Sequence, residues 1–392
     1  MNVVVLGCGF GGVEVARTLR KEAKELDITM IDHTPQFDYP PAYPELLSGK
    51  VTPEAISHDL KKFATKLGAG FIQAEVVNID VKAKKVKTKA TAEDDARDIP
   101  YDFLVIAIGA EQTFFGIPGA EKRSYTVNTM NGAIETKNAL DTLDYSKESS
   151  IAVIGAGLTG IEVAGELVDY FKDRGARARI SLVEMMPRIL PALPKENVAI
   201  YVRKFLSDSG VEILTETAVQ EVSEGEITFK DGKKLPYNII IWTAGIKPNR
   251  LLEILDLPKV KGWLKVDSYL RVEGMDDVFA VGDTVYFERE GVRAGQNVEE
   301  AEGQGRAAAE NIIRTIKNLS FKKNALPKKY YSLYTMKGEK LKRYRPKNTI
   351  QNPKALISLG DDKAVLYFGG MVFKVFAYRL KKFVEHRYMK RF

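Results

Sequence analysis

The sequence predicts an α/β protein that contains the same parallel-sheet unit twice. The first observation is a near repeat: VVVLGCGFGGVEVARTL begins at Val3, and IAVIGAGLTGIEVAGEL begins at Ile151. The second observation is that each copy reads as a continuous apolar strand, a glycine-rich turn and a helix. We therefore expect two Rossmann-like dinucleotide-binding domains, followed by a small C-terminal α+β region.

The composition is that of a folded protein with two or three domains. The chain has 392 residues, of which 45% are apolar and 28% charged. Nothing ahead of the first strand resembles a secretion signal, and no apolar stretch approaches the roughly 18 residues needed to cross a bilayer, so we expect a cytoplasmic protein without a membrane span. Cys8 is the only cysteine, which excludes an internal disulfide. His33, His58 and His386 lack metal-ligand spacing, so we expect no metal site.

The first copy has the residues that a bound dinucleotide requires. The strand is followed by Gly7, Gly9 and Gly12, which serve the tight turn, the approach of a pyrophosphate and the packing of helix on strand. The phosphates are then expected at the helix N-terminus, where free N–H groups favour an anion. A second strand ends at Asp32, whose carboxylate suits a ribose hydroxyl.

The second copy repeats each of these parts. Gly155, Gly157 and Gly160 follow its first strand, and its second strand ends at Glu184. An acidic residue at this place repels the 2′-phosphate of NADP, so we expect NADH as the substrate nucleotide.

Two nucleotide-binding folds in one chain suggest a resident flavin and a visiting nicotinamide that exchange a hydride. YDFLVIAIGA (residues 101–110) and YNIIIWTAGIKPN (residues 237–249) each place a buried strand before a glycine, as expected where the chain crosses between nucleotide domains. VFAVGD (residues 278–283) places Asp283 just after a strand, within reach of a ribityl hydroxyl.

At this point the chain resembles a known family. TFFGIPGAE, GAGLTGIEVAGEL, IIIWTAGIKPN and VFAVGD are similar to motifs of the type II NADH:quinone oxidoreductases, a group of two-dinucleotide-binding-domain flavoproteins with the glutathione-reductase-like fold. The resemblance covers roughly the first 315 residues. It implies an FAD domain at residues 1–112 and 246–318, an NADH domain at 113–245 and a C-terminal region at 319–392. It also implies electron transfer from NADH through FAD to a membrane quinone, without proton pumping.

The resemblance assigns further contacts to both cofactors. For FAD and NADH these are, beyond the residues already named, Phe10, Gly11, His33, Pro41, Val76, Val77, Ala107, Gly109, Gly245 and Gly282.

Glu166 is the candidate catalytic residue. The resemblance places a glutamate at this position of the second helix near nicotinamide and flavin, whereas the first copy has Thr18. Such a carboxylate can orient the nicotinamide carboxamide or relay a proton when the flavin is reoxidised. Glu162, one turn earlier, is the competing candidate.

The quinone site follows the family less closely. The segment from Phe37 to Ile56 resembles the family loop beneath the flavin, but Ala42 and Tyr43 stand where relatives often have two leucines. Relatives also carry two glutamines at a helix start. One register of AGQNVEEAEGQGRAAAENI puts Glu299 and Gly303 at these positions, and the other puts Gln296 and Glu300 there.

Other activities remain open. Sulfide:quinone oxidoreductases share the fold but need a cysteine pair, which Cys8 alone does not supply. The same reasoning excludes reductases that use a redox disulfide. A soluble NADH-dependent reductase of a small electron-carrier protein and a slow redox sensor are the remaining alternatives.

The C-terminal region carries the positive charge of the chain. Residues 317–392 contain 20 Lys and Arg against 4 acidic residues, a net charge of +16, whereas residues 1–316 carry −9. KALISLGDDKAVLYFGG is typical of a hairpin that turns at Asp361 and Asp362, and KKYYSLYTMKGEKLKRYRPKN is basic and aromatic without a nucleic-acid-binding motif.

The last 22 residues predict an amphipathic helix. Its expected apolar stripe is Phe373, Phe376, Ala377, Leu380, Val384, Tyr388 and Phe392, and its expected basic residues are Lys374, Lys381, Lys382, Arg387, Lys390 and Arg391. This pattern, and the similar tail of the family, indicate peripheral binding to an anionic membrane at its cytoplasmic face. The alternative is a helix packed on its own domain. The sequence leaves a homodimer open.

Overall fold

The computed structural model describes residues 1–89, 96–323 and 339–392. The chain divides into two compact units. Unit 1 comprises residues 1–37, 59–111 and 248–349, and unit 2 comprises residues 38–58, 112–247 and 350–392. Residues 38–58 and 350–392 therefore group with the predicted NADH domain. The assignment of one cofactor to each domain stays a prediction.

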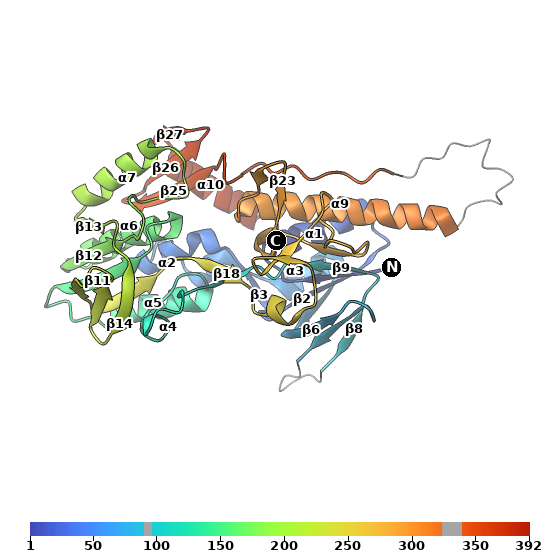
Figure 1. Ribbon diagram of the computed structural model, residues 1–392, viewed down its shortest axis with the longest axis horizontal. Helices are drawn as coiled ribbons and strands as arrows, with labels where there is room; N and C mark the ends of the chain where they lie inside the picture. The colour runs from blue at the N-terminus through green and yellow to red at the C-terminus, as the bar shows by residue number, and fades with distance from the viewer. Residues whose placement is uncertain (90–95, 324–338) are drawn as a thin grey trace. The chain divides into compact units, whose positions relative to one another are not determined.

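Unit 1 contains the first of the two predicted parallel sheets, with strand order β21-β9-β1-β2-β5. Its strands β2 and β9 are labelled in Figure 1. Its central strand β1 is buried on both faces, and Val3, Val4, Val5 and Leu6 are all fully inaccessible to solvent. A continuous apolar strand is typical of such a sheet. The elements of this sheet and its helices are β1 (Asn2–Leu6), α1 (Phe10–Glu22), β2 (Asp27–Asp32), α3 (Leu60–Leu67), β5 (Gly70–Gln73), β9 (Phe103–Ile106), β21 (Val278–Ala280) and α9 (Val298–Lys323).

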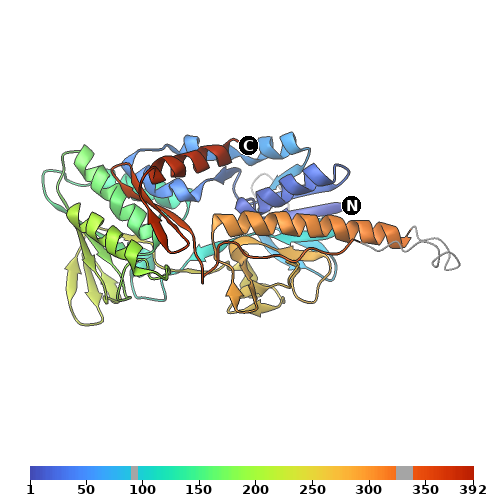
Figure 2. The same cartoon turned by 90° about the horizontal axis from the view of Figure 1, so that it is seen from above.

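Helices α1 and α9 of unit 1 lie side by side, as seen from above in Figure 2. Their backbones meet at two glycines, since a Cβ built on Gly305 would lie 2.5 Å from the carbonyl oxygen of Gly11. Beside this contact, the Arg306 guanidinium binds the buried Glu14 carboxylate at 2.6 Å. These contacts fix α1, which follows the first glycine turn, against α9.

The remaining elements of unit 1 are small sheets and short helices. They are β6 (Val76–Asp80), β7 (Lys85–Thr88), β8 (Asp98–Pro100), α8 (Leu251–Ile254), β19 (Lys259–Val260), β20 (Trp263–Lys265), η3 (Gly282–Thr284), β22 (Val285–Tyr286), β23 (Glu288–Arg289) and β24 (Val292–Arg293). Four strands straddle the unit boundaries: β3 (Gln36–Asp38), β4 (Ser57–Asp59), β10 (Ala110–Gln112) and β18 (Ile246–Pro248).

Unit 2 contains the second parallel sheet, with strand order β13-β12-β11-β17. This arrangement confirms the predicted duplication, because β11 and β12 pair in parallel as β1 and β2 do. The elements are β11 (Ser149–Ile154), α6 (Leu158–Asp173), β12 (Ala178–Val183), α7 (Glu196–Asp208), β13 (Val211–Leu214), β14 (Val219–Ser223), β15 (Glu226–Phe229), β16 (Lys234–Pro236) and β17 (Ile239–Trp242). Additional helices are η1 (Pro40–Ala42), α2 (Tyr43–Ser48), η2 (Pro53–Ile56), α4 (Ala120–Arg123) and α5 (Met130–Asp141).

The predicted C-terminal hairpin is confirmed. β25 (Ala355–Gly360) and β26 (Lys363–Phe368) pair antiparallel, with Asp361 and Asp362 at the turn in left-handed conformation, and β27 (Met371–Phe373) adds a third strand. Helix α6 contacts both β25 and strands β11 and β12 of the parallel sheet. The hairpin therefore packs on α6 within unit 2. Of the basic aromatic segment 328–348, residues 328–338 lie outside the described residues.

The C-terminal helix is shorter than predicted. α10 spans Ala377–Met389, because Phe373 belongs to β27 and Phe376 adopts a left-handed conformation with φ 61° at the N-cap. Its buried residues are Ala377, Lys381 and Tyr388. Among the described residues, no helix combines the length and apolar character that crossing a membrane requires.

Candidate active site

The first glycine turn has the geometry that a bound pyrophosphate requires. Gly7 has φ 86°, and a Cβ on Gly12 would lie 1.9 Å from the carbonyl oxygen of Gly7, so neither position accepts a side chain. Gly9 forms the N-cap of α1 without a side-chain cap, and a Cβ built on it meets nothing within 4 Å. The turn therefore leaves open backbone at the N-terminus of α1, which favours an anion.

The second glycine turn repeats this geometry in unit 2. Gly155 has φ 102°, and a Cβ on Gly160 would lie 1.8 Å from the carbonyl oxygen of Gly155. Gly157 caps α6 with φ −73° and ψ −167°, against −73° and −166° for Gly9. A Cβ on Gly157 also meets nothing within 4 Å. The three glycines of the second turn thus match those of the first in geometry.

The acid at the end of the second strand is held by the glycine turn in each unit. In unit 1, the Asp32 carboxylate accepts hydrogen bonds from the N–H groups of Cys8 at 2.7 Å and Thr34 at 2.9 Å. His33 Nδ1 lies 3.1 Å from the same carboxylate. Burial opposes ionisation, but these hydrogen bonds lower the pKa of Asp32, and the bond to Asp32 raises the pKa of His33. Asp32 is therefore an ionised, oriented acceptor.

Glu184 has the same arrangement in unit 2. Its carboxylate accepts hydrogen bonds from the N–H groups of Ala156 and Met186, both at 2.9 Å, and Glu184 is buried. The residue after the first glycine and the residue two places beyond the acid are the donors in both units. This correspondence places Asp32 and Glu184 at equivalent positions.

Asp283 lies in η3, directly after β21, as the sequence predicted. Its carboxylate has no hydrogen-bond or ion-pair partner among the described residues, and desolvation raises its pKa to about 6. Neighbouring backbone groups are satisfied: Gly282 N–H donates to Gln304 Oε1 at 2.8 Å, and Gly109 N–H donates to Thr284 Oγ1 at 2.9 Å. The unpaired carboxylate is available to a ligand hydroxyl.

The other predicted cofactor residues are placed by several elements. The ring of Phe10 packs edge-on against Phe37, and a Cβ on Gly11 would lie 3.0 Å from a methyl of Val281. Ala107 follows β9, and a Cβ on Gly7 would lie 2.3 Å from its carbonyl oxygen. Val76 and Val77 begin β6, Pro41 lies in η1, and Gly245, with φ 77°, packs against Phe115 and Thr113. Their contacts with cofactors stay predictions.

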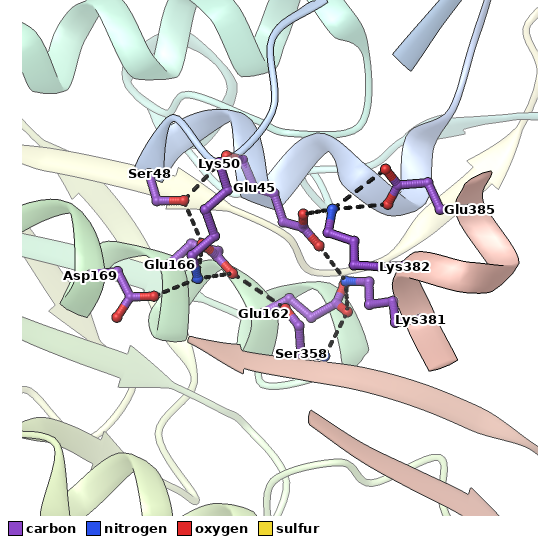
Figure 3. Close-up of polar contacts among 10 residues, drawn as sticks. All are labelled: Glu45, Ser48, Lys50, Glu162, Glu166, Asp169, Ser358, Lys381, Lys382 and Glu385. Atoms are coloured by element: carbon purple, nitrogen blue, oxygen red, sulfur yellow. Dashed lines mark hydrogen bonds and ion pairs between the residues drawn. The ribbon is translucent and has the colours of Figure 1, made fainter. Parts of the chain in front are cut away.

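Glu166, the candidate catalytic residue, is fully buried on α6 in unit 2. Its Oε2 lies 2.5 Å from Ser48 Oγ and 3.1 Å from Lys50 Nζ, and its Oε1 lies 3.4 Å from Ser358 Oγ (Figure 3). Burial raises the pKa of Glu166, and the hydrogen bonds and charge of Ser48 and Lys50 offset this in part. A carboxyl group with a raised pKa is suited to proton transfer.

Glu162, the competing candidate, has a different set of partners. It accepts hydrogen bonds from Ser358 N–H at 3.0 Å and from Lys381 Nζ at 2.8 Å. Lys381 also lies 3.3 Å from Glu45, and Lys382 pairs with Glu45 and Glu385 (Figure 3). Glu162 is therefore paired with a cation of α10. We call the ten residues of Figure 3 the charge cluster: Glu45, Ser48, Lys50, Glu162, Glu166, Asp169, Ser358, Lys381, Lys382 and Glu385.

The prediction that Lys381 and Lys382 lie on a membrane-facing basic surface is wrong for these two residues. The Lys381 side chain is only 7% exposed, and both lysines bind carboxylates of unit 2. The sequence pattern placed them off the apolar stripe, but Ala377, Lys381 and Tyr388 form the face of α10 that packs inward. The buried carboxylates Glu45 and Glu162 supply the attraction that offsets the desolvation of the Lys381 ammonium.

The predicted quinone residues divide between the units. In unit 2, Ala42 and Tyr43 are buried at 0% and 3% exposure, and burial raises the pKa of Tyr43. In unit 1, the buried Glu300 carboxylate accepts hydrogen bonds from Tyr344 Oη at 2.7 Å and from two backbone N–H groups at 2.6 and 2.7 Å.

The Tyr344 hydroxyl also lies over Gly303, 3.0 Å from the position of a Cβ, and Glu299 is half-buried. Glu300 and Gly303 thus anchor the segment that contains Tyr344 to α9. A contact between any of the predicted quinone residues and quinone stays a prediction.

Sequence reasoning missed most of the charge cluster. Ser48 ends α2 and Lys50 follows that helix, while Asp169 lies on α6 and Ser358 lies on β25. The signal that could have found Asp169 is its spacing: Glu162, Glu166 and Asp169 follow one another at intervals of four and three residues, which puts all three acids on one helix face. Their partners come from segments more than 100 residues away, which no local pattern identifies.

The residues of unit 1 fit a flavin dinucleotide. The open N-terminus of α1 suits the pyrophosphate, Asp32 suits the ribose, and the unpaired Asp283 carboxylate suits a polyol hydroxyl. In unit 2, the turn at Gly157 and the held carboxylate of Glu184 fit a nicotinamide dinucleotide that lacks a 2′-phosphate.

Comparisons with known proteins agree with this reading of the fold. A model of the family described as pyridine nucleotide-disulphide oxidoreductase matches residues 1–305. The type II NADH:quinone oxidoreductase of Staphylococcus haemolyticus is 31% identical over 347 residues, which cover 81% of this chain and 82% of that protein. A probable mitochondrial NADH-ubiquinone oxidoreductase of Schizosaccharomyces pombe is 30% identical over 378 residues, which cover 86% of this chain and 66% of that protein.

A solved structure supports the fold over nearly the whole chain. NDH2 from Plasmodium falciparum, in complex with NADH, has a TM-score of 0.79 at 19% identity, and the match covers 98% of this chain and 93% of that one. At this identity the match shows the fold alone. The chain covers only 61% and 63% of two longer solved chains with the same fold.

Proposed function

Because the chain belongs to the pyridine nucleotide-disulphide oxidoreductases, and within them to the type II NADH:quinone oxidoreductases, we propose that it oxidises NADH and transfers the electrons through FAD to a membrane quinone. The observation that carries the proposal is the duplicated site. Each unit holds an open glycine turn at a helix N-terminus and an acid bound to the N–H that follows the first glycine. One chain therefore has two dinucleotide sites, as electron transfer between two dinucleotides requires.

FAD binds to unit 1 and NADH to unit 2 in this proposal. Gly9, Asp32 and Asp283 hold the flavin dinucleotide, and Gly157 and Glu184 hold NADH. When bound, FAD supplies the group that accepts a hydride and releases two electrons. Glu184 selects NADH because its buried carboxylate disfavours a second negative group at the ribose.

Glu166 supplies a proton during acceptor reduction. Conversion of NADH and quinone to NAD⁺ and quinol consumes one proton from solution per turnover, in addition to the hydride. A buried carboxyl with a raised pKa can hold that proton and return to the carboxylate when it donates it. Sulfide oxidation by a cysteine pair is not open to a chain whose only cysteine, Cys8, is buried in the glycine turn.

The test of the activity is spectroscopic. The purified protein, incubated with FAD, is expected to show flavin absorption that NADH bleaches without oxygen and that a short-chain quinone restores. A protein that stays colourless after incubation with FAD contradicts the proposal. Slow bleaching relative to turnover of related enzymes supports a redox sensor instead.

Nucleotide selectivity is tested with Glu184→Gln. The variant is expected to lose its preference for NADH over NADPH in steady-state oxidation. Glu212→Gln, at an exposed glutamate on the neighbouring strand β13, is the matched control and should keep the preference. Equal rates with NADH and NADPH in the unmodified protein contradict the role of Glu184.

We also propose that the protein binds peripherally to the cytoplasmic face of an anionic membrane. The support is a group of exposed apolar side chains at the C-terminus, here called the apolar patch: Phe368, Met371, Phe373, Val375, Phe376, Leu380, Phe383 and Val384. Val375 and Phe376 are 76% and 69% exposed, and Lys374, Arg379 and Arg387 are exposed basic residues of the same segment. Apolar and basic groups together are typical of interfacial segments.

Sedimentation with anionic vesicles tests this proposal. The full chain is expected to sediment, and Phe376→Asp with Phe383→Asp should weaken binding strongly. Ile254→Asp, at an apolar residue of α8 that is 65% exposed, is the control and should leave binding unchanged. Absence of binding by the unmodified chain contradicts membrane contact and favours a soluble reductase of an electron-carrier protein.

A further inference from the structure

Lys50 is a partly buried cation that contacts two acids of α6. It follows Gly49, whose left-handed conformation ends α2, and its side chain is 21% exposed. Lys50 Nζ lies 2.6 Å from Asp169 Oδ2 and 3.1 Å from Glu166 Oε2 (Figure 3). Lys50 therefore divides one positive charge between two buried carboxyl groups, the fully buried one of Glu166 and that of Asp169, which is 9% exposed.

The surroundings of Glu166 contain more acids than bases. α2 contributes Glu45 beside Ser48, α6 contributes Glu162 and Asp169, and α10 contributes Tyr378, Lys381, Lys382 and Glu385, while Asp362 lies near Tyr378. The charge cluster thus holds five carboxyl groups and three ammonium groups. If all were ionised, its net charge would be negative, which favours a proton on one carboxyl group.

The three lysines form ion pairs with different sets of acids. Lys381 binds Glu45 and Glu162, and Lys382 binds Glu45 and Glu385. Within the described residues, Lys50 is the cation that forms an ion pair with Glu166. The charge state of Glu166 therefore depends more directly on Lys50 than on the other two.

We propose that Lys50 is a positioning residue for acceptor reduction: its ammonium group holds the Glu166 carboxyl group in place. Because Asp169 competes for the same ammonium group, the two contacts together set the pH at which Glu166 exchanges its proton. This inference rests on the proposed role of Glu166 as proton donor. Ser48 completes the arrangement, because its single hydroxyl proton is within reach of both Glu166 Oε2 and the Glu45 carbonyl oxygen. Ser48 can donate to an ionised Glu166 or accept from a protonated one.

The geometry predicts opposite effects for the two partners. Lys50→Met removes the cation, so the proton of Glu166 is held more tightly and its pKa rises by about one unit or more. Asp169→Asn removes the competing acid and leaves the Lys50 charge to Glu166 alone, so the pKa of Glu166 falls. The asparagine oxygen can still accept the hydrogen bond that Asp169 accepts from Asp361 N–H at 2.7 Å.

The experiment uses the FAD-loaded protein and two measurements. The first is the pH profile of kcat for a short-chain quinone, with KM for NADH measured in parallel. Because the protonated form of Glu166 is the donor, kcat is expected to fall as the pH rises through its pKa. Lys50→Met should move this limb to higher pH and Asp169→Asn to lower pH, with KM for NADH unchanged. Lys50→Arg should restore the position of the unmodified protein.

The second measurement does not depend on turnover. The infrared band of the protonated Glu166 carboxyl group, identified by its loss in Glu166→Gln, is titrated in the oxidised protein without NADH or quinone. Its midpoint should shift upward in Lys50→Met and downward in Asp169→Asn. Lys204→Met is the control, because Lys204 is 75% exposed and pairs with Asp208 outside the charge cluster. It should shift neither measurement.

The outcomes separate the two proposals. Shifts of equal sign, or unchanged midpoints, in Lys50→Met and Asp169→Asn overturn the role of Lys50, whatever the activity. Should Glu166→Gln keep the turnover and pH profile of the unmodified protein, the proposed proton transfer by Glu166 fails and with it the link to acceptor reduction. The infrared midpoints would then still decide whether Lys50 controls Glu166.

Discussion

Replacing Gly165 by alanine should destabilise unit 2 by disturbing the contact of α6 with β25. A Cβ on Gly165 would lie 2.3 Å from both the carbonyl carbon and oxygen of Leu359, and 2.7 Å from Gly360 N. Ordinary Cβ contacts begin near 3.4 Å. The atoms in contact belong to the backbone of β25, so no side-chain rotation relieves the clash, and the strand has to move by about 1 Å.

The same movement breaks hydrogen bonds of the charge cluster. Ser358 N–H donates to Glu162 at 3.0 Å and Asp361 N–H donates to Asp169 at 2.7 Å. A displacement of about 1 Å takes both beyond hydrogen-bond range. Each bond to a charged group contributes about 1.5–3 kcal/mol. Alanine gains about 1 kcal/mol in helix propensity. The net loss in the free energy of unfolding is therefore about 2–5 kcal/mol.

Urea unfolding, followed by circular dichroism, measures this loss. Gly157→Ala is the matched control at the N-cap of the same helix, because Gly157 has an extended conformation and a Cβ there meets nothing within 4 Å. Its cost should be about 1 kcal/mol or less. If Gly165→Ala proves as stable as the unmodified protein, the close approach of α6 and β25 is refuted.

Three further predictions concern individual polar groups. Burial raises the pKa of Glu166 above 4.5, so the folded state keeps a proton that the unfolded state releases. The free energy of unfolding should therefore fall as the pH rises from about 4.5 through the pKa of Glu166 in the folded state. In urea titrations at several pH values, Glu166→Gln should remove this part of the pH dependence. Tyr344→Phe should cost about 1.5–3 kcal/mol in the same assay, because Glu300 loses the hydroxyl at 2.7 Å, whereas an unchanged midpoint contradicts the anchoring role of Glu300. Asp283→Ala should lower the amount of FAD that remains bound after gel filtration, and full retention argues against a contact of Asp283 with the flavin.

Much of the fold follows from local patterns. Both glycine turns, both acids and the hairpin at Asp361 and Asp362 were predicted from the sequence, and the structure has them at the expected places. Each of these features is set by residues close together in the chain, such as a glycine that must adopt a left-handed conformation or a strand that must be apolar on both faces. Cys8 N–H and Ala156 N–H reach Asp32 and Glu184 because the duplicated strand, turn and helix determine that spacing.

The C-terminal helix shows where local patterns fail. The sequence placed Lys381 and Lys382 among basic residues that face a membrane, but both bind the buried Glu45. A stripe on a helix indicates which residues share a face and not what covers that face. Lys381 can be buried on the inward face of α10 because its ammonium group forms ion pairs with carboxylates of α2 and α6.

The sequence by itself determined that the chain carries two glycine turns, each with an acid in place, and that Glu162 and Glu166 lie one turn apart on the helix after the second turn. The tertiary structure alone decided which lysine forms an ion pair with each acid of α6: Lys50 pairs with Glu166 and Asp169, and Lys381 pairs with Glu162. The physical reason is that these lysines lie more than 100 residues from their partners, so that the folding of three distant segments onto α6 brings the charges together. Their attraction then depends on distance and burial, neither of which is encoded in any single segment.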